Sequence, residues 1–501
     1  MKRFLILISI LTIYILSAPS AFGQYDTQNE KLEAMIEQGI ADWKIPALSV
    51  LVMKDGKSVF KKTYGVKNIN TKEKANTQTL FTMASTTKAL IAMSMGILVD
   101  EGKVEWDDKV RKHYPDFQLS DSYITEDARI KDLFTHNLGI GNADWIWYAR
   151  NLSTEETIEK FAQTQKAYPL RGGYQYQNMG YVIAGEVIRT ISGKQWDQFL
   201  KERIFDPLGM SRTAGMSADV LALGNVATPH YDDLEEGVIE INYAFFDQAG
   251  AAGSLYSCID DMEKYLAFIQ NKGVHNGDTL LQPTTFEYLF QPKIIIESGF
   301  YPTAQLTKPH WKSYGMGWFQ HDYKGEKVDF HTGSIDGLVA IHGWLRDHDL
   351  GVYVFTNLDH AELRHAIMYK VFDLYALGGD RDWNKEIYEM YDGFEKEYKD
   401  YLEDLDKKRV LNTSPSKPLK DFIGTYKHPS LGNYTITMKG EGLVASLNDK
   451  FDLDLNHWHH DTFRSLVQPQ WRSKEFITFQ LDEMGKVKSL EFRGNEFLKM
   501  K

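Results

Sequence analysis

The pattern of apolar and polar positions predicts a helix and then a β-hairpin near the start of the chain. Residues 29–43 have helical spacing, and two β-rich runs at 47–53 and 58–64 enclose the sequence Lys-Asp-Gly at 54–56. Asp-Gly between two such runs is a strong hairpin signal, because the tight primed turn requires positive φ.

Helical patterns dominate the middle of the chain. A helix is predicted from residue 84 to residue 100, where Glu101 and Gly102 stop it. The clearest later helices are predicted at 180–191 and 259–270.

Residues 314–357 become β-rich again, with a second hairpin around 346–349, and an apolar helix at 361–377 closes the region. We expect strands from both ends of this region to share one sheet, with a helical insertion between them. This is an α/β arrangement with a cleft between a sheet half and a helical half.

The last quarter of the chain differs in composition. Residues 382–410 are rich in Glu, Lys, Asp and Tyr and have no proline, which predicts an exposed helical connector. A Ser- and Pro-containing linker follows at 412–418. Alternating runs such as 434–437 and 476–479 predict a small all-β domain, a sandwich or a barrel. Covering the cleft, binding a partner and mediating oligomerisation all remain open as its role.

The first residues resemble a secretory signal peptide. A basic head precedes an apolar stretch of 13 residues at 4–16, shorter than the roughly 20 residues that cross a bilayer. Small residues at 21 and 23 favour cleavage before Gln24, although an uncleaved anchor or a buried helix fits the same stretch. We expect an exported protein, periplasmic or secreted, with no stable membrane span after cleavage.

Length and composition agree with several folded parts. The chain has 501 residues, 43% hydrophobic and 25% charged, which suits a large soluble protein of more than one domain. The predicted division is a signal peptide at 1–23, an α/β domain at 24–380, a helical connector and linker at 381–418, and a small all-β domain at 419–501.

Charge and cysteine content exclude some partners and stabilising devices. The formal net charge of −12 disfavours nucleic acid and anionic membranes as partners. Cys258 is the single cysteine, so it forms no intramolecular disulfide, and we expect it to be a small packing residue.

Ser85 and Lys88 form the first motif with candidate chemistry. Ser85 begins the helix predicted at 84–100, and Lys88 follows three residues later on the same face. A serine hydroxyl needs an adjacent base, and a lysine can serve when burial lowers its pKa. The same spacing occurs twice more, but in a hairpin and in a linker. A serine N-cap beside a solvated lysine is the structural alternative.

Two further motifs are each unique in the chain. Tyr-Gln-Asn stands at 176–178, where a tyrosine can shuttle a proton and an amide can hold a substrate carbonyl. His-Thr-Gly stands at 331–333 and is followed by Ser334, so that the backbone can approach a substrate and its N–H groups can stabilise an oxyanion. A loop tyrosine and an ordinary strand end are the respective alternatives.

The three motifs together, about 90 and about 155 residues apart, resemble those of the penicillin-recognising serine hydrolases. The resemblance is to the branch with class C β-lactamases, D-alanyl-D-alanine carboxypeptidases, D-aminopeptidases and related esterases. It covers roughly residues 30–378, including segments 132–140 and 249–255. It implies a β-lactamase/transpeptidase-like α/β domain, with an antiparallel sheet flanked by helices and a helical subdomain. The tail resembles the lipocalin-like, barrel-like domain of some members.

The resemblance also implies catalytic roles. Ser85 matches the acylated nucleophile, Lys88 matches the residue that activates it, and Tyr176 matches the residue that passes protons to the leaving group and from the hydrolytic water. No metal and no cofactor is implied.

The remaining motif residues match substrate-binding positions. Asn178 matches the amide that contacts the acyl side chain, and the N–H groups of Ser85 and Ser334 match the oxyanion hole. Thr332 and Gly333 complete the strand motif behind His331. His331 stands where many members have lysine and would orient the proton network or meet a substrate carboxylate.

Departures from the family pattern concern substrate preference. Histidine in place of lysine at 331 makes efficient β-lactam hydrolysis less expected. Gln177 and the Asn-Leu pair at 137–138 also differ from the commoner residues and leave the substrate open.

A histidine-rich run at 457–461 is a candidate metal cluster, but a hydrolytic zinc site usually needs a further distant ligand. Strand alternation would point His457 and His459 to one face and His460 to the other, so we expect a surface strand. The chain has no Gly-x-Ser-x-Gly nucleophile elbow and no phosphate-binding glycine loop with lysine.

The sequence thus predicts a serine hydrolase that forms an acyl-enzyme on amide or ester bonds, above all in D-amino-acid-containing peptides or amides. Carboxypeptidase-like and aminopeptidase-like action both fit. A small-ester esterase or weak β-lactamase is the alternative, and a non-catalytic penicillin-binding-like sensor of cell-wall fragments is the alternative of another class. The expected partner is a small molecule or peptide, and an oligomer is compatible with the sequence.

Overall fold

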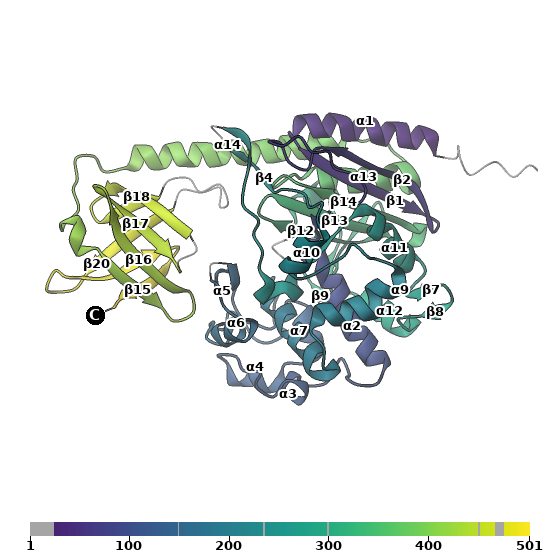
Figure 1. Ribbon diagram of the computed structural model, residues 1–501, viewed down its shortest axis with the longest axis horizontal. Coiled ribbons are helices and arrows are strands. Elements are labelled where there is room, and N and C mark those ends of the chain that lie inside the picture. Colours follow the sequence, from purple (N-terminus) through teal and green to yellow (C-terminus); the bar gives the residue numbers. More distant parts are fainter. Residues whose placement is uncertain are drawn as a thin grey trace, which may run out of the picture.

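The computed structural model describes residues 25–148, 150–233, 236–297, 300–448, 451–465 and 475–500. The predicted signal peptide lies outside these residues. A large α/β domain and a smaller β-barrel are joined by the long helix α14 (Trp383–Lys408), which runs along the top of Figure 1. Among the described helices, none has the length and apolar character needed to cross a membrane.

The α/β domain is built on one antiparallel sheet of eight strands in the order β2-β1-β14-β13-β12-β11-β10-β9. Strands from both ends of the domain therefore share the sheet, as predicted. Asp55 and Gly56 in the first hairpin turn have φ of 51° and 72°, the positive values that the Asp-Gly signal requires. The strands are β1 (Ala47–Lys54), β2 (Lys57–Gly65), β9 (Ile294–Ile295), β10 (Lys312–Tyr314), β11 (Phe319–Tyr323), β12 (Glu326–Ile335), β13 (Leu338–Leu345) and β14 (Leu350–Thr356).

Helices cover both faces of the sheet. Most of them come from the segment of sequence between strands β2 and β9. The predicted helices at 29–43, 84–100, 180–191, 259–270 and 361–377 correspond to α1, α2, α7, α11 and α13. The helices of the domain are α1 (Asp26–Asp42), α2 (Thr87–Asp100), α3 (Val110–His113), α4 (Ser122–Asp127), α5 (Asp144–Tyr148), α6 (Thr154–Phe161), α7 (Asn178–Ser192), α8 (Trp196–Leu200), α9 (Asp206–Leu208), α10 (Ser217–Leu223), α11 (Ile259–Gln270), α12 (Pro283–Leu289) and α13 (Leu363–Phe372). Three two-stranded sheets complete it, formed by β3 (Phe81–Thr82) with β6 (Tyr256–Ser257), β4 (His230–Asp233) with β5 (Gly237–Glu240), and β7 (Val274–His275) with β8 (Asp278–Thr279).

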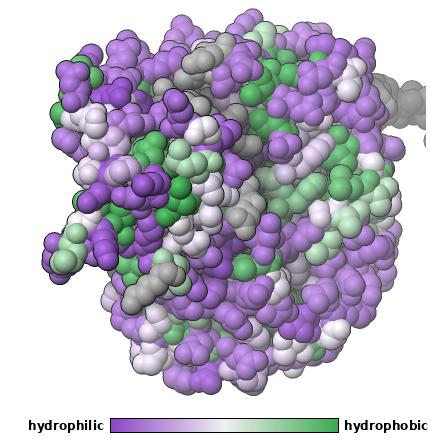
Figure 2. Space-filling view, turned by 60° about the vertical axis from the view of Figure 1, so that its left-hand side comes forward, coloured by the Kyte–Doolittle hydropathy of each residue, from purple (hydrophilic) through white to green (hydrophobic). Residues whose placement is uncertain are grey.

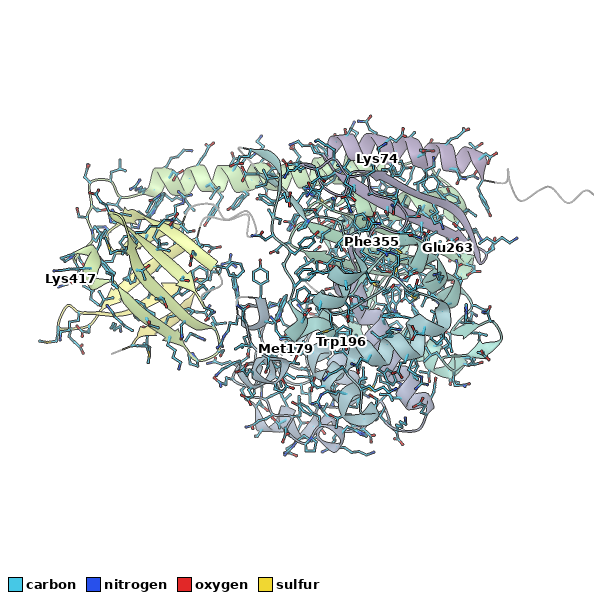
Figure 3. All side chains as sticks on the ribbon, viewed as in Figure 1. Lys74, Met179, Trp196, Glu263, Phe355 and Lys417 are labelled. Atoms are coloured by element: carbon cyan, nitrogen blue, oxygen red, sulfur yellow. The ribbon has the colours of Figure 1, made fainter. Side chains whose placement is uncertain are left out.

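Alternate side chains of the central strands enter two separate cores. On β1, Val50 and Val52 pack with α1 and α13, whereas Leu51 and Met53 face the core that contains α2, α7 and α11. Phe355 of β14 belongs to the second core, together with Met179 and Trp196. All three are labelled in the α/β domain in Figure 3. Both sheet faces are therefore buried, and the second one carries the helical half.

Helix α2 is the central element of that half. Every residue from Thr87 to Leu98 is buried, and most of them are apolar, which is typical of a helix surrounded by protein. A short 3₁₀ turn, η1 (Ala84–Thr86), leads into it and carries Ser85. The nucleophile predicted from the sequence thus stands where the sheet meets the buried helix.

Glycine permits the sheet backbone to approach this turn. A Cβ atom at Gly333 of β12 would collide with the Met83 carbonyl oxygen and lie 3.0 Å from the Ser85 nitrogen. Gly317, with φ of 82°, approaches α2 in the same way, since its Cβ would lie 2.8 Å from the Ala89 nitrogen. Backbone therefore packs directly against backbone around Ser85.

The C-terminal part is a closed barrel of eight strands, because β15 pairs with β22. This decides between the sandwich and the barrel that the strand pattern left open, and it confirms the barrel-like domain that the resemblance implied. Lys417 lies at its edge in Figure 3, just before the first strand. The strands are β15 (Gly424–His428), β16 (Gly432–Lys439), β17 (Gly442–Leu447), β18 (Phe451–His459), β19 (Thr462–Ser465), β20 (Phe476–Leu481), β21 (Val487–Phe492) and β22 (Asn495–Lys499).

The histidine-rich run lies at the end of β18, where the expected alternation breaks. The pairing with β19 shifts register between His457 and His459, so the two rings do not follow one regular face. The Arg409 and Arg464 guanidinium groups cover Trp458 between them, at 5.0 and 4.5 Å from its ring. In the described ranges, no group of three or more His, Cys, Asp or Glu side chains could hold a metal ion.

The barrel contacts the α/β domain through α5. Trp145 meets Phe492 at a ring distance of 6.0 Å, and Tyr148 stacks on Phe451 at 5.5 Å. Figure 2, with this side turned forward, shows a mainly hydrophilic surface on which hydrophobic residues gather in patches. These aromatic contacts fix the position of the barrel beside the helical half of the α/β domain.

The close approach of β12 to η1 predicts a specific sensitivity to added volume. Gly333→Ala should lower the free energy of unfolding by about 1–3 kcal/mol, because its Cβ meets backbone atoms that cannot move aside. Gly351→Ala on β14 is the matched control: its nearest neighbour lies at 3.6 Å, so stability should stay or rise by up to about 1 kcal/mol. Urea unfolding of both variants measures the difference, and equal stabilities would contradict the packing described.

Candidate active site

A cavity of about 760 Å³ opens where the sheet, the helical half and the barrel meet. Its walls come from segments far apart in sequence, including α5, the loop before α7, β12 and one barrel turn. The lining residues are Ser85, Asn142, Asp144, Trp145, Trp147, Tyr148, Tyr174, Tyr176, Asn178, Phe300, Tyr301, Pro302, Phe319, Thr332, Ser334, Ile335, Asp336, Asp359, His360 and Arg493.

Lys88 lies directly beneath Ser85. Its Nζ is 3.1 Å from Ser85 Oγ and also donates to Asn178 Oδ1 at 2.8 Å and to the Ala252 carbonyl oxygen at 2.6 Å. The side chain is fully buried, and this burial lowers the Lys88 pKa to about 7, against a smaller opposing effect of the Asp144 carboxylate. A substantial fraction of the amine is therefore neutral near pH 7 and able to accept a proton from Ser85.

Tyr176 lines the same cavity as Ser85 and also neighbours the serine hydroxyl. Burial raises its pKa well above the ordinary value, and a hydrogen bond with Ser85 opposes that rise. The Lys88 ammonium group lies 5.0 Å from the centre of the Tyr176 ring. A phenol that stays protonated beside the nucleophile can pass a proton on, as a general acid requires.

Asn178 connects Lys88 to a carboxylate that the sequence analysis did not identify. Its Nδ2 donates to Asp144 Oδ1 at 2.9 Å, while its Oδ1 accepts from Lys88. Asp144 also accepts from Trp147 Nε1 at 3.0 Å and from Asn142 Nδ2 at 3.0 Å. No local motif marks Asp144, because only the folding of α5 against α7 brings it to the site.

His136 fixes the segment that carries Tyr176. Its Nδ1 accepts the Gln177 N–H at 3.0 Å, its carbonyl oxygen accepts the Gln175 N–H at 2.9 Å, and its ring lies 4.2 Å from that of Tyr176. Burial, with Lys88 and His331 nearby, holds the His136 pKa well below its ordinary value. The ring is a neutral support that adds no charge beside Lys88.

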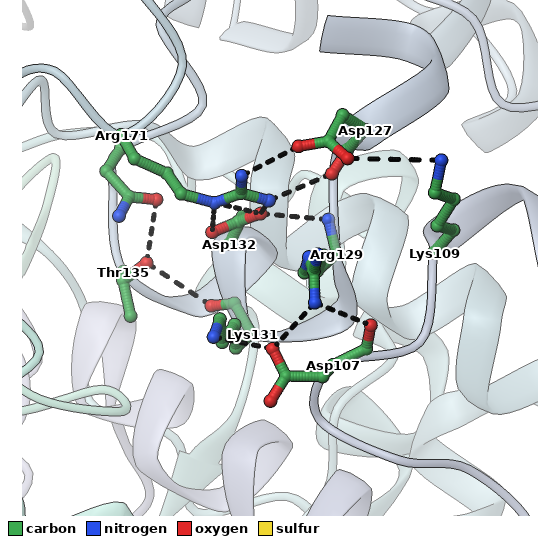
Figure 4. Close-up of polar contacts among 9 residues, drawn as sticks. Asp107, Lys109, Asp127, Arg129, Lys131, Asp132, Thr135 and Arg171 are labelled. Carbon is green, nitrogen blue, oxygen red and sulfur yellow. Dashed lines mark hydrogen bonds and ion pairs between the residues drawn. The ribbon is translucent and has the colours of Figure 1, made fainter.

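A second anchor of the same segment is the ion-pair network in Figure 4. Arg171 Nη2 lies 2.6 Å from Asp132 Oδ2, and Arg171 Nη1 lies 2.8 Å from Asp127 Oδ2. Asp132 is only 2% exposed and also accepts the Arg129 N–H at 2.8 Å. The chain entering the Tyr176 motif is thereby held to the segment around His136.

Strand β12 borders the cavity with its last residues. It pairs with β11 only as far as Phe330, so the following residues have an unpaired edge. Thr332 and Ser334 line the cavity, and Gly333 brings the strand against the Ser85 nitrogen. An unpaired strand edge beside the nucleophile offers N–H groups to a substrate carbonyl.

His331 lies inside the protein, outside the residues that line the cavity. Its Nε2 accepts from the Tyr314 hydroxyl at 2.9 Å, and its Nδ1 donates to the Thr332 carbonyl oxygen at 2.7 Å. Burial, followed by Lys88, lowers its pKa to about 3. The ring is neutral, so it brings no positive charge to the place where many relatives have lysine.

The chain belongs to the Beta-lactamase family, which it matches over residues 32–374. Residues 408–500 match a domain of unknown function, DUF3471. Members of this family share a β-lactamase fold and are serine hydrolases. The resemblance to penicillin-recognising serine hydrolases and the expected fold class are both confirmed.

Curated relatives have low sequence identity to this chain, but the matches cover most of its length. Unguisins hydrolase ungD' of Aspergillus campestris is 25% identical over 435 residues, covering 82% of this chain and 78% of that protein. Protein flp of Staphylococcus aureus is 23% identical over 334 residues, covering 66% of this chain and 63% of that protein.

Solved structures share the fold. The octameric penicillin-binding protein homologue from Pyrococcus abyssi has a TM-score of 0.61 and 22% identity, with 94% of this chain and 99% of that chain covered. D-amino acid amidase from Ochrobactrum anthropi, complexed with L-phenylalanine amide, has a TM-score of 0.58 and 20% identity, with 69% and 99% covered.

The Asp144 carboxylate should shift the pH at which Lys88 becomes able to act as a base, although burial has the larger effect on its pKa. If neutral Lys88 is the base, kcat/KM rises with pH through an apparent pKa of about 7. Asp144→Asn keeps the hydrogen bond from Asn178 but removes a charge that favours ammonium, so the rising limb should move to lower pH. Asp404→Asn on the connector is the control, and a limb that stays or moves upward in Asp144→Asn contradicts the assignment.

The anchor in Figure 4 should matter for stability where it is buried and little where it is exposed. Asp132→Ala should lower the free energy of unfolding by about 1–3 kcal/mol, because it removes the most buried partner of Arg171, which keeps Asp127 and is itself 32% exposed. Asp107→Ala removes a 57%-exposed carboxylate of the same network and should cost about 0–1 kcal/mol. Equal losses in urea unfolding would show that burial does not govern this network.

Proposed function

We propose that this protein is a serine hydrolase that acts through an acyl-enzyme on amide or ester bonds, above all those of D-amino-acid-containing peptides or amides. The observation that carries the proposal is the fully buried Lys88 amine 3.1 Å from the Ser85 hydroxyl. Burying a lysine without a carboxylate partner is costly, and proton transfer from a nucleophile is the use that matches this arrangement.

In the proposed first half-reaction, the neutral Lys88 amine takes the Ser85 proton as Oγ attacks the substrate carbonyl carbon. The negative charge that develops on the carbonyl oxygen is stabilised by the N–H groups of Ser85 and Ser334. Tyr176 donates its proton to the leaving amine or alcohol and regains one through the Lys88 side. The carbonyl–leaving-group bond breaks, and the acyl group stays on Ser85.

In the second half-reaction, water takes the place of the leaving group. As Tyr176 accepts a proton from that water, it passes its own phenol proton to the neutral Lys88 amine, and the new hydroxyl attacks the ester carbonyl. The bond from the carbonyl carbon to Ser85 Oγ then breaks, and Oγ leaves with the proton that Lys88 has just received. The product is a free acid, and the protein returns to its starting protonation state without a cofactor.

The character of the cavity supports amides of D-amino acids over β-lactams. His331 is neutral and lies behind the residues that line the cavity, so an anionic β-lactam or a peptide carboxylate gains no charge contact from it. A structural relative is a D-amino acid amidase, and another relative is named as a hydrolase. Aminopeptidase-like or amidase-like action therefore fits better than carboxypeptidase-like action.

The alternatives differ in what they would require of the site. A small-ester esterase needs the same attack by Ser85, but it needs less help from Tyr176 in protonating the leaving group, because an alcohol leaves more easily than an amine. A non-catalytic sensor of cell-wall fragments has no need for Lys88 and Tyr176 beside Ser85. Export to the periplasm or beyond, and assembly into an oligomer such as that of the octameric relative, remain part of the proposal.

Four substrates distinguish these possibilities: a D-Ala-D-Ala peptide, a D-amino-acid amide, a short-chain nitrophenyl ester and a chromogenic cephalosporin. We expect the amide to have the highest kcat/KM and Ser85→Ala to abolish turnover, since a lost nucleophile costs about 10⁶-fold in kcat in a comparable hydrolase. Turnover of the ester alone would favour an esterase. Equal rates for Ser85→Ala and the unaltered protein would disprove the nucleophile assignment.

A further inference from the structure

A second cavity of about 220 Å³ lies beside the active-site cavity and shares Tyr148 and Asp336 with it. Five of its lining residues are aromatic and only one is charged. The full set is Tyr148, Asn242, Tyr243, Ala244, Phe245, Phe246, Asp336 and Phe451. We call it the aromatic side pocket.

Three separate parts of the chain build its apolar walls. Tyr243 stacks on Phe245 at 5.4 Å within the loop before η4 (Asp247–Ala252), and Phe246 packs on Trp147 of α5 at 5.0 Å. Tyr148 of α5 stacks on Phe451 of the barrel at 5.5 Å. The small domain thus supplies one wall, which gives it a position next to the chemistry.

Asp336 stands at the boundary between the two cavities. It follows the end of β12 and accepts a hydrogen bond from the Tyr148 hydroxyl at 2.5 Å. Its other neighbours with charge are Asp359 and His360, which also line the active-site cavity and are 2.8 Å apart. Burial raises the pKa of Asp336 to about 6, with a further contribution from Asp359. A cation arriving here would meet two carboxylates.

The spacing along β12 relates this carboxylate to the scissile bond. Asp336 is two residues beyond Ser334, so it lies at most about 7 Å further along the chain. The α-ammonium group of an amino-acid amide is two bonds from the scissile carbonyl, and a charge-assisted hydrogen bond adds about 2.8 Å. Ser334 and Asp336 both line the active-site cavity, so a substrate carbonyl held at Ser334 has its own ammonium on the side of the cavity where the Asp336 side chain can meet it.

We infer that the aromatic side pocket binds the apolar, preferably aromatic, side chain of an amino-acid-derived substrate, while Asp336 binds that residue's free ammonium group. This inference rests on the proposed function and names its substrate class: amides or peptides with a free amino group next to a large apolar side chain. Aromatic rings also attract the ammonium group through their faces.

Binding to the Ser85→Ala protein tests the pocket without requiring turnover. The probes are D-phenylalanine amide, N-acetyl-D-phenylalanine amide, which lacks the charge, and D-alanine amide, which lacks the ring. Isothermal titration should give an affinity for D-phenylalanine amide at least about tenfold above the other two, within the range that one apolar group or one paired charge supplies.

Two substitutions should separate the contributions of charge and ring. Asp336→Asn keeps a hydrogen-bond partner for Tyr148. It should lower the affinity for D-phenylalanine amide to that for the N-acetyl form, and the affinity for the N-acetyl form should stay unchanged. Phe245→Ala should lower the affinity for D-phenylalanine amide to that for D-alanine amide. The controls are Asp278→Asn on the exposed β7–β8 hairpin and Phe394→Ala, an aromatic residue 43% exposed on α14. Thermal unfolding confirms that each variant folds.

Equal affinities for the three probes, or an unchanged preference in both pocket variants, would overturn the inference. The proposed function is tested separately by hydrolysis with the unaltered Ser85. If neither an amide nor an ester is hydrolysed while the binding order holds, the proposed function fails and the pocket stands. Hydrolysis of D-phenylalanine and D-alanine amides with equal affinity would support the function and exclude the pocket.

Discussion

The contact between the buried Lys88 amine and the Ser85 hydroxyl is the constraint on which the rest of the active site depends. A lysine in this position has lost its hydrating water, so the surrounding protein must supply hydrogen-bond acceptors for its amine. Asn178 and the Ala252 carbonyl supply them, from elements more than 70 residues apart in sequence. Burial lowers the Lys88 pKa to about 7, which is the property that the proposed role as a base requires.

The architecture around this contact consists of anchors rather than further reacting groups. Helix α2 is buried on all sides, and glycine lets β12 reach the Ser85 backbone. His136 and Arg171 fasten the segment that carries Tyr176. Because these supports are neutral or internally paired, they fix positions without adding charge to the proton path.

The barrel and α5 extend the site beyond this shared chemistry. Trp145 and Tyr148 meet barrel residues on one side and line the active-site cavity on the other. Arg493, in the β21–β22 turn, reaches the same cavity and lies 4.7 Å from the Trp145 ring. In this protein, the Ser85, Lys88 and Tyr176 cluster is therefore combined with a cavity wall that its own C-terminal domain completes.

The sequence by itself determined the order of elements, both hairpins, the helical insertion and the positions of Ser85, Lys88 and Tyr176, because helical spacing, turn chemistry and short motifs are local in the chain. It did not reveal Asp144, the burial of His331, the broken alternation at His457 or the contact between barrel and cavity, and its strand pattern alone did not distinguish a barrel from a sandwich. Each of these depends on which distant segments pack together. Desolvation and close packing are properties of that assembly, so tertiary structure alone decided which polar groups lost water and faced one another.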